Sequence, residues 1–278
     1  MSYEFLTIYW RDMLRFVRFR IALVASLIQP ALWMALYGAA MSSNFSRLSS
    51  GMTVPDCAVA VSYLTFMGAG VIALTTLFTS LFGGITLLFD KNWGLMRELL
   101  ASPMPRNHII IGIGLSGVTK SFIQSMVIMA FGLVIGVRFF PGYSLLQRAG
   151  AIMGILLFVG VFSLGFLFLS SAISMTMETP EGLQAVITLL TLPLFFASNA
   201  LYPIDAFPGA VRIISQFNPL THLVNGVRYF AIGDDFYAIG VHYVYSVNDV
   251  LISFLALIVF AAAMFLVAWR VFKTAVVT

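Results

Sequence analysis

Residues 89–106 read FDKNWGLMRELLASPMPR and are the one polar island between two long apolar segments of the chain. At the helical step of about 100° per residue, the leucine side chains of this stretch share one arc, while Arg97 and Glu98 lie on the opposite side. Residues 102–105 end the helix, because a residue before proline avoids the helical region of backbone space. The stretch therefore predicts an amphipathic helix that lies flat at a membrane interface, with its polar face toward the aqueous side.

The composition of the whole chain indicates an integral membrane protein. Of its 278 residues, 60% are hydrophobic and 9% are charged, whereas soluble domains carry about 25% charged residues. Apolar runs of about 20 residues recur, each long enough as a helix to cross a hydrocarbon core of about 30 Å. The sequence therefore predicts an all-α membrane protein with about six transmembrane helices in a single domain, residues 1–278. Their expected positions are residues 21–41, 58–82, 118–137, 150–173, 183–201 and 250–269.

The charged residues indicate how the chain is oriented. The net charge is +4, but the lysine and arginine residues flank apolar spans and form no dense basic patch, which argues against nucleic acid as a partner. With the N-terminus inside, ten of the fifteen lysine and arginine residues fall on the cytoplasmic side and five fall outside. This asymmetry favours a multi-pass protein of the plasma membrane with both termini in the cytoplasm.

A second amphipathic segment lies at the N-terminus, in residues 1–20. Leu6, Trp10 and Leu14 share one arc of a helix, and Arg11 and Arg15 share the other. Basic residues favour anionic headgroups, and aromatic residues suit the membrane interface. We therefore expect an interfacial helix that contacts membrane lipid on the inner leaflet. The alternative, a solvated charged lead-in to the first span, stays open.

A third informative stretch, residues 195–230, reads FFASNALYPIDAFPGAVRIISQFNPLTHLVNGVRYF. Its three prolines prevent this apolar run from crossing a bilayer as one helix. Pro208 can begin a short helix, and Asn218-Pro219 can end it. Irregular backbone at membrane depth is tolerated where it is buried in protein or lines a cavity. The sequence therefore predicts a re-entrant hairpin on the outer side, at residues 202–228, which closes the outer end of a transport path.

Lys120 and Gln124 are polar residues of the third apolar segment, one helical turn apart on the same face. A charge deep in the bilayer would mark a transport path. Alternatively, the preceding loop extends further, and Lys120 reaches the inner headgroups. Both interpretations stay open, and Lys120 and Gln124 are our candidates for residues of the path.

Residues 112–117 of the same segment match the dinucleotide fingerprint G-x-G-x-x-G letter for letter. The fingerprint requires a preceding strand and a βαβ unit, whereas this copy lies within an apolar region of membrane length. Small residues at this spacing allow helices to pack closely. We therefore predict close helix packing here rather than a nucleotide site.

The first and third stretches together resemble the type-2 permease family of ABC transporters, in its drug-exporter branch. The residues that carry the resemblance in the first stretch are Gly94, Arg97, Glu98, Leu99, Ser102 and Pro103. Those that carry it in the other stretch are Pro203, Pro208, Asn218, Pro219 and Arg228. The chain departs from the family pattern at His222, where an aromatic residue is common, and at Asn225, where an acidic residue is common.

The resemblance implies a division of labour between two subunits. The first set of residues would form a coupling helix seated on a separate ATP-binding subunit, and the second set would form the outer gate. ATP and Mg would be bound by that partner, because this chain lacks the phosphate-binding motif G-x-x-x-x-G-K-[ST]. The single cysteine, Cys57, and three scattered histidines give no metal pattern. We expect no enzymatic activity, cofactor or metal in this chain.

The expected function is that of a permease subunit in a dimeric ABC exporter, most simply a homodimer. The substrate moved outward would be an amphiphilic drug or a lipid-like molecule. Two alternatives stay open. The first, within the same family, is export of a polysaccharide or a lipid-linked saccharide. The second is an ion-coupled secondary carrier, for which Lys120 is the one plausible coupling residue.

Overall fold

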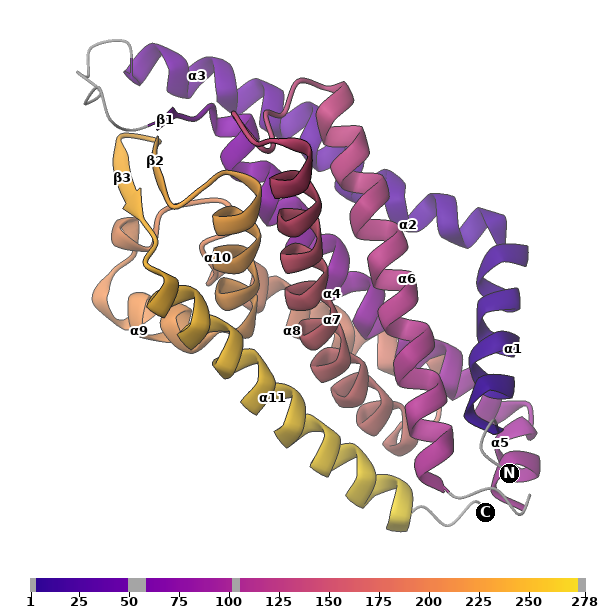
Figure 1. Cartoon of the computed structure of the whole chain (residues 1–278). Helices are drawn as coiled ribbons and strands as arrows, with labels where there is room; N and C mark the ends of the chain where they lie inside the picture. The colour runs from indigo at the N-terminus through magenta and orange to yellow at the C-terminus, as the bar shows by residue number, and fades with distance from the viewer. Residues whose placement is uncertain (1–3, 50–58, 102–105, 275–278) are drawn as a thin grey trace.

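The computed structural model describes residues 4–49, 59–101 and 106–274 of the chain, and most of these residues are helical. Figure 1 shows the long helices running beside one another as a bundle, with the short strands gathered at one end. In chain order the elements are α1 (Glu4–Arg18), α2 (Arg20–Leu32), η1 (Trp33–Gly38), α3 (Ala39–Ser49), β1 (Val59–Ala60), α4 (Tyr63–Asn92), α5 (Leu95–Ala101), α6 (Arg106–Val134), α7 (Leu145–Thr176), α8 (Pro180–Phe196), η2 (Ile204–Ala206), α9 (Gly209–Phe217), α10 (Pro219–Ala231), β2 (Asp235–Ala238), β3 (Val241–Val244) and α11 (Val247–Thr274).

Five of the described helical segments are long and apolar enough to cross a membrane: Leu23–Asn44, α4, His108–Val134 within α6, α7 and α11. The shortest of them has 22 residues and extends about 33 Å. The span expected at residues 183–201 corresponds to α8, whose 17 residues extend about 25 Å, the lower limit for a membrane crossing. The structure therefore confirms an all-α membrane protein, with five long spans and one shorter helix.

The third span begins earlier than the sequence predicts. α6 starts at Arg106 rather than near residue 118, because residues 108–117 continue the helix and pack against α1. A Cβ added at Gly112 would lie 2.8 Å from the backbone oxygen of Phe5 on α1. The glycines of this segment therefore serve close helix packing, as predicted.

The first span is helical throughout but irregular in its middle. α2 contains Pro30, which cannot donate a backbone hydrogen bond, and the wide π turn η1 begins three residues later at Trp33. Such turns interrupt the regular helical ladder. The hydroxyl of Tyr37, in η1, lies 2.8 Å from the hydroxyl of Tyr202, which precedes η2. The irregular part of the span is therefore the part that contacts the region of the predicted hairpin.

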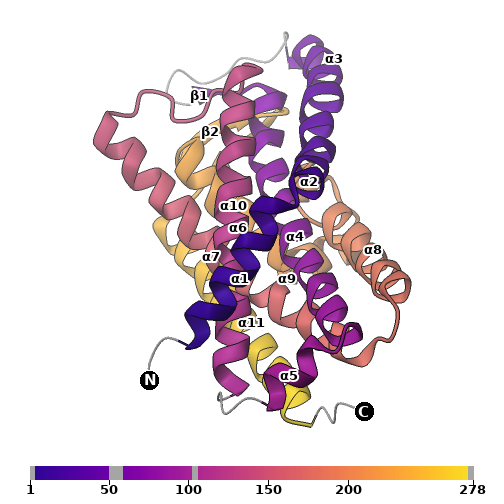
Figure 2. The ribbon, with the colours of Figure 1, turned by 90° about the vertical axis from the view of Figure 1, so that its right-hand side faces the viewer.

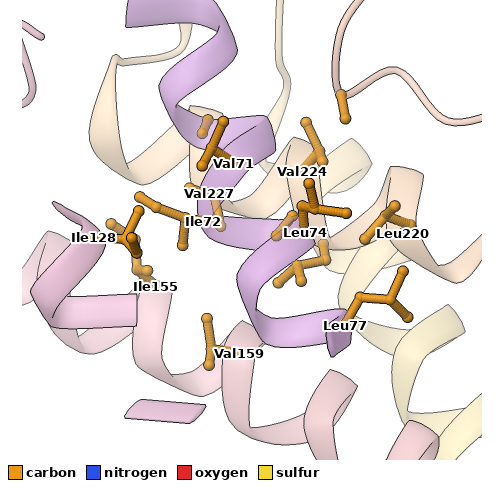
Figure 3. Close-up of a cluster of buried hydrophobic side chains, with 14 of the residues drawn as sticks. Val71, Ile72, Leu74, Leu77, Ile128, Ile155, Val159, Leu220, Val224 and Val227 are labelled. Carbon is orange, nitrogen blue, oxygen red and sulfur yellow. The ribbon is translucent and has the colours of Figure 1, made fainter. Parts of the chain in front are cut away.

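α4 lies at the centre of the bundle, and its side chains meet those of three other helices. Figure 3 shows this buried cluster. The labelled members are Val71, Ile72, Leu74 and Leu77 of α4, Ile128 of α6, Ile155 and Val159 of α7, and Leu220, Val224 and Val227 of α10. α10 thus contributes to the core, although it is too short to span a membrane.

The predicted hairpin contains the helix breaks that the sequence indicates. Pro208 immediately precedes α9, and α9 ends at Phe217. Asn218 caps the next helix, because its side chain accepts a hydrogen bond from the backbone of Leu220 (2.9 Å), and Pro219 occupies the first position of α10. Figure 1 shows α9 and α10 on the same side of the bundle as the strands. That this hairpin dips into the membrane from outside stays a prediction.

A small sheet forms where the sequence predicts a polar loop. β2 pairs in parallel with β1 and antiparallel with β3. The β2–β3 connection consists of Ile239 and Gly240, which both have positive φ, at 55° and 75°. Two-residue hairpins of this kind match the twist of the flanking strands. Isoleucine is rare in that conformation, so the sequence gives no ordinary sign of the turn.

We expect Gly84→Ala to destabilise the protein, because the added Cβ would lie 2.7 Å from the backbone oxygen of Ser170 on α7. Overpacking of this kind costs about 1–3 kcal/mol of folding free energy. Thermal unfolding of the purified variant in detergent measures the effect. Gly209→Ala is the matched control, since a Cβ there meets nothing within 4 Å. Equal melting temperatures for both variants would contradict close packing of α4 on α7.

Candidate functional site

The turn between α4 and α5 sets the direction of the predicted coupling segment. α4 ends at Asn92, and Gly94 follows with a φ of +80°, a left-handed backbone that favours glycine. The Gly94 carbonyl accepts a hydrogen bond from the backbone of Arg97 (3.0 Å) within α5. Figure 2 shows α5, the start of α1 and the end of α11 together at the lower end of the bundle. These three segments define the α5 end of the molecule.

α5 has one buried and one exposed face. Met96 is fully buried and belongs to an apolar cluster with Phe272 of α11. Arg97 and Glu98 are exposed, and Trp93 in the preceding turn is 70% exposed. The amphipathic character predicted for residues 89–106 is therefore present in a shorter helix. Of the other predicted coupling residues, Ser102, Pro103 and the side chain of Leu99 lie outside the described part of the structure.

Asp90, in the last turn of α4, holds α1 against the bundle. Its carboxylate accepts hydrogen bonds from Arg11 Nη2 (2.6 Å) and Arg15 Nη2 (2.8 Å), both on α1. Asp90 is 2% exposed, and a carboxylate buried to this degree needs ionic partners. α1 is therefore fixed at a point just before the turn into α5. The sequence signal for this contact is the four-residue spacing of the two arginines, which places them on one helix face.

A second ion pair joins α1 to α6. Lys120 Nζ lies 2.6 Å from Asp12 Oδ2, and the Ser116 hydroxyl donates a hydrogen bond to the same oxygen. Asp12 is 8% exposed. Lys120 is thus neutralised by a residue of the N-terminal helix, a partner that neither interpretation of the sequence considered. Its role in a transport path stays a prediction.

Gln124 lies one turn further along α6 and joins α2 to α4. Its amide nitrogen donates to Ser26 Oγ (2.8 Å), and its amide oxygen accepts from the hydroxyl of Thr79. Both polar groups of Gln124 are therefore occupied by contacts within the bundle, and the residue is 4% exposed. Lys120 and Gln124 each bond to a neighbouring helix, and their place in a transport path stays a prediction.

The end of α4 is also bonded to the turn between α7 and α8. Lys91 Nζ donates to the backbone oxygens of Met175 (2.8 Å) and Met177 (2.9 Å), where its charge complements the carboxyl end of α7. Asn92 Nδ2 donates to the backbone oxygen of Glu178 at 3.1 Å. Three consecutive residues, beginning at Asp90, therefore bond outward to α1 and to the α7–α8 turn.

A groove of about 780 Å³ lies between α4 and α8. The residues that line the groove are Ile85 of α4 and Pro180, Glu181, Gln184, Ala185, Thr188, Leu189 and Leu192 of α8. Its walls are mainly apolar, and the polar side chains lie in the half of α8 that starts at the α7–α8 turn. This groove begins beside the turn to which Lys91 and Asn92 are bonded.

Arg228, the last residue of the predicted hairpin at residues 202–228, is completely buried. Its Nη2 donates to the backbone oxygens of Asn199 (2.7 Å) and Ala200 (3.3 Å), and its guanidinium lies 3.5 Å from the ring centroid of Phe66 on α4. A cation over an aromatic face is stabilised electrostatically. Arg228 therefore fixes the chain after α8 to α4 and α10.

The other predicted gate residues lie on the segments that Arg228 connects. Pro203 precedes η2, and Asn218 donates its amide nitrogen to the backbone oxygen of Leu194 on α8 (2.7 Å). Asn225 Oδ1, where the family commonly has an acidic group, accepts from Asn199 Nδ2 (2.6 Å) and the Tyr245 hydroxyl (3.4 Å). The amide thus retains the acceptor function without a charge.

The described residues contain no group of three or more His, Cys, Asp or Glu side chains placed to hold a metal ion. His242 Nε2 lies 2.7 Å from the carboxylate of Asp235, across the β2–β3 hairpin. This contact joins neighbouring strands, and it is a pair rather than a ligand set.

We expect the contacts of Asp90 to be strongly coupled energetically. Asp90→Asn and Arg15→Gln should each lower the melting temperature, and the double variant should lose less than the sum. Arg15→Gln leaves the buried Asp90 carboxylate with Arg11 as its remaining arginine contact, and Asp90→Asn removes the acceptor of Arg15. Thermal unfolding of the four proteins gives the double-mutant cycle. The control is Asp205→Asn, which removes an exposed pair with Arg212 and should change stability by less than about 0.5 kcal/mol. Strict additivity would contradict the coupling.

Comparison with known proteins identifies the family. The model of the family described as "ABC-2 type transporter" matches residues 3–231. The chain is 31% identical over 210 residues to a putative transport permease, ycf38, of Cyanophora paradoxa, covering 75% of this chain and 67% of that protein. It is 22% identical over 223 residues to the daunorubicin resistance ABC transporter permease protein DrrB1 of Streptomyces coeruleorubidus (80% and 73% covered). It is 23% identical over 277 residues to the inner membrane transport permease YadH of Escherichia coli K12 (96% and 93% covered). This chain therefore belongs to the ABC-2 type transporter family.

Proposed function

We propose that this chain is the permease subunit of an ATP-driven exporter that moves an amphiphilic drug or lipid-like molecule outward. The observation that carries the proposal is the last turn of α4. There Asp90 bonds to α1, and Lys91 and Asn92 bond to the turn before α8. The exposed charges of α5 follow directly, so a force on α5 acts on all of these contacts together.

The proposed coupling is a rigid-body movement. A separate ATP-binding subunit would press on the exposed face of α5, which carries Arg97 and Glu98. Because α4 is a continuous helix of 30 residues, a displacement of α5 would tilt α4 and shift the α7–α8 turn with it. Interfaces that slide as units are a common route for such transitions. The groove between α4 and α8 would then change its width.

The substrate class follows from the walls of that groove. Leu189 and Leu192 offer apolar surface, and they are 73% and 52% exposed. Gln184 and Thr188 offer hydrogen-bonding groups on the same helix. A molecule with an apolar body and a polar end fits such a surface. The name of the relative DrrB1, a daunorubicin resistance permease, supports a drug rather than a saccharide.

The proposal includes a partner and an orientation. ATP and Mg would be bound by the separate subunit, and two copies of this chain would enclose the substrate path. The α5 end would face the cytoplasm of a cell whose plasma membrane holds the chain, with both termini on that side. α1, which exposes Trp10 and Val17, would contact lipid there.

We expect Glu98→Lys to reduce transport at least about tenfold when the chain is reconstituted with its ATP-binding subunit, because a reversed charge opposes the partner's field. The free energy of unfolding should stay within about 0.5 kcal/mol of the wild-type value, since the residue is exposed. Asn248→Lys, an exposed residue at the start of α11, is the control and should retain transport. Full transport by the Glu98→Lys protein would contradict a coupling role.

Vesicles made without the ATP-binding subunit test whether transport requires ATP. Vesicles that contain this chain alone should hydrolyse no ATP and accumulate no amphiphile from a panel that includes daunorubicin. Accumulation driven by a proton or sodium gradient, without the ATP-binding subunit, would overturn the proposed function in favour of a secondary carrier.

We expect Thr188→Trp to block the groove, because the indole adds bulk at an exposed position of α8. Transport of amphiphiles should fall at least about fivefold, while the melting temperature stays close to wild type. Met153→Trp is the control, since Met153 is 60% exposed on α7 and does not line the groove. Equal transport by both variants would show that the substrate passes elsewhere.

A further inference from the structure

A second cavity, of about 390 Å³, lies between the first turns of α7 and the last turn of α10. It is remote from α5 and from the groove beside α8. Tyr143 and Gly150 line it on one side, and Tyr229, Phe230 and Asp234 line it on the other. The backbone of Phe140 donates to the oxygen of Ala231 at 2.7 Å and holds the two sides together. Figure 1 shows the start of α7 beside α10.

Aromatic rings form adjoining walls of this cavity. The rings of Tyr229 and Phe230 are 5.1 Å apart at an angle of 84°, so their faces point in different directions. Tyr143 supplies a third ring from the loop before α7. Aromatic side chains that line a pocket can offer the negative face of a ring to a cation, and a cation without N–H groups suits such a surface.

The charged lining residue of the cavity is Asp234, an acid. Burial, the Asp234 carboxylate and Tyr229 raise the pKa of the Tyr143 phenol above its ordinary value, so that phenol stays neutral. Arg148 and Arg228 are adjacent in the chain to lining residues, but neither lines the cavity. Arg148 directs its Nε to the backbone oxygen of Tyr143 (3.0 Å), and Arg228 directs its Nη2 to the backbone oxygen of Asn199 (2.7 Å). The cavity therefore combines aromatic faces with a negative charge, which disfavours an anion and favours a cation.

The acceptors that line the cavity are the Asp234 carboxylate and the hydroxyls of Tyr143 and Tyr229. Gln147 also lines it, but its side-chain oxygen already accepts from the backbone of Ser144 (2.9 Å) in the cap of α7. A primary ammonium, which has three N–H donors, would find one carboxylate and few free acceptors. A quaternary ammonium has no donors to satisfy.

Gly150 is an exposed residue of α7 that lines the cavity. It lies within α7, where glycine is less favourable than alanine by about 0.5–1 kcal/mol. A Cβ at this position would meet nothing within 4 Å, so close packing does not require the glycine. The open space in front of Gly150 is the cavity itself.

We propose that this cavity binds a trimethylammonium group, with the rings of Tyr143, Tyr229 and Phe230 around it and Asp234 as its counter-ion. The group could belong to a choline lipid headgroup or to a soluble amphiphilic cation. The site is separate from the proposed transport groove, so binding to it does not depend on the proposed export function.

Saturation-transfer NMR on the purified full chain tests the site, with choline as the probe. In maltoside micelles we expect a trimethyl signal for the wild type and a signal at least about fivefold weaker for its neutral analogue, 3,3-dimethylbutan-1-ol. Asp234→Asn and Gly150→Leu should each reduce the choline signal by a similar factor. Gly150→Leu replaces glycine with a better helix former and fills the cavity, so loss of its signal with a wild-type melting temperature reports on the cavity rather than on folding.

A second arm distinguishes the two sources of the group. In phosphatidylcholine nanodiscs the choline signal should disappear if lipid headgroups occupy the cavity, and should persist if the cavity admits only soluble cations. Either result is consistent with trimethylammonium binding. Three results would overturn it: no choline signal from the wild type in micelles, an equal signal from the neutral analogue, or full signals from both variants. The control variant is Asp205→Asn, an exposed acid at η2, which should bind choline as the wild type does.

Discussion

The buried carboxylate of Asp90 is the constraint on which the α5 end of the molecule depends. This carboxylate is 2% exposed and is paired with Arg11 and Arg15, which approach it from α1. The other contacts of α1 include its packing against α6 and the ion pair of Asp12 with Lys120, so the Asp90 contacts are what bonds α1 to α4. The ion pairs therefore determine where α1 sits. Asp90 lies in the last turn of α4, so α1 is bonded to α4 close to where the chain turns into α5.

In the middle of α4, buried hydroxyl groups are satisfied by hydrogen bonds rather than by ion pairs. In an apolar interior each polar group must find a partner within the protein. Thr75, Thr76 and Ser80 of α4 donate to the backbone oxygens four residues earlier, at 2.7–2.9 Å. Thr76 also lies 3.1 Å from the Ser125 hydroxyl of α6. These hydroxyl groups are bonded within their own helix, so α4 can carry them and still pack at the centre of the bundle.

The features that the sequence predicted correctly are those with local causes. Pro208 and Asn218-Pro219 mark helix boundaries because proline restricts its own turn, and the structure has breaks at both places. The buried and exposed faces of α5 follow from helical periodicity. The partner of Lys120 could not be predicted in this way, because Asp12 lies 108 residues away and the pairing depends on how α1 meets α6. The predicted start of α6, near residue 118, was wrong for a similar reason, because the helix extends back to Arg106 where it packs against α1.

α8 is the element best placed to respond to a movement of α5. It is the shortest of the six helices considered as spans, contains Pro193, and exposes much of one face. The turn before it receives hydrogen bonds from Lys91 and Asn92, and the segment after it is held by Arg228. α8 is therefore fixed at both ends but loosely packed between them. In the proposed mechanism, a tilt of α4 would change the angle of α8 more than that of the other long helices, because their interiors are closely packed and resist deformation. The short helix α8 would then be the wall of the groove that moves.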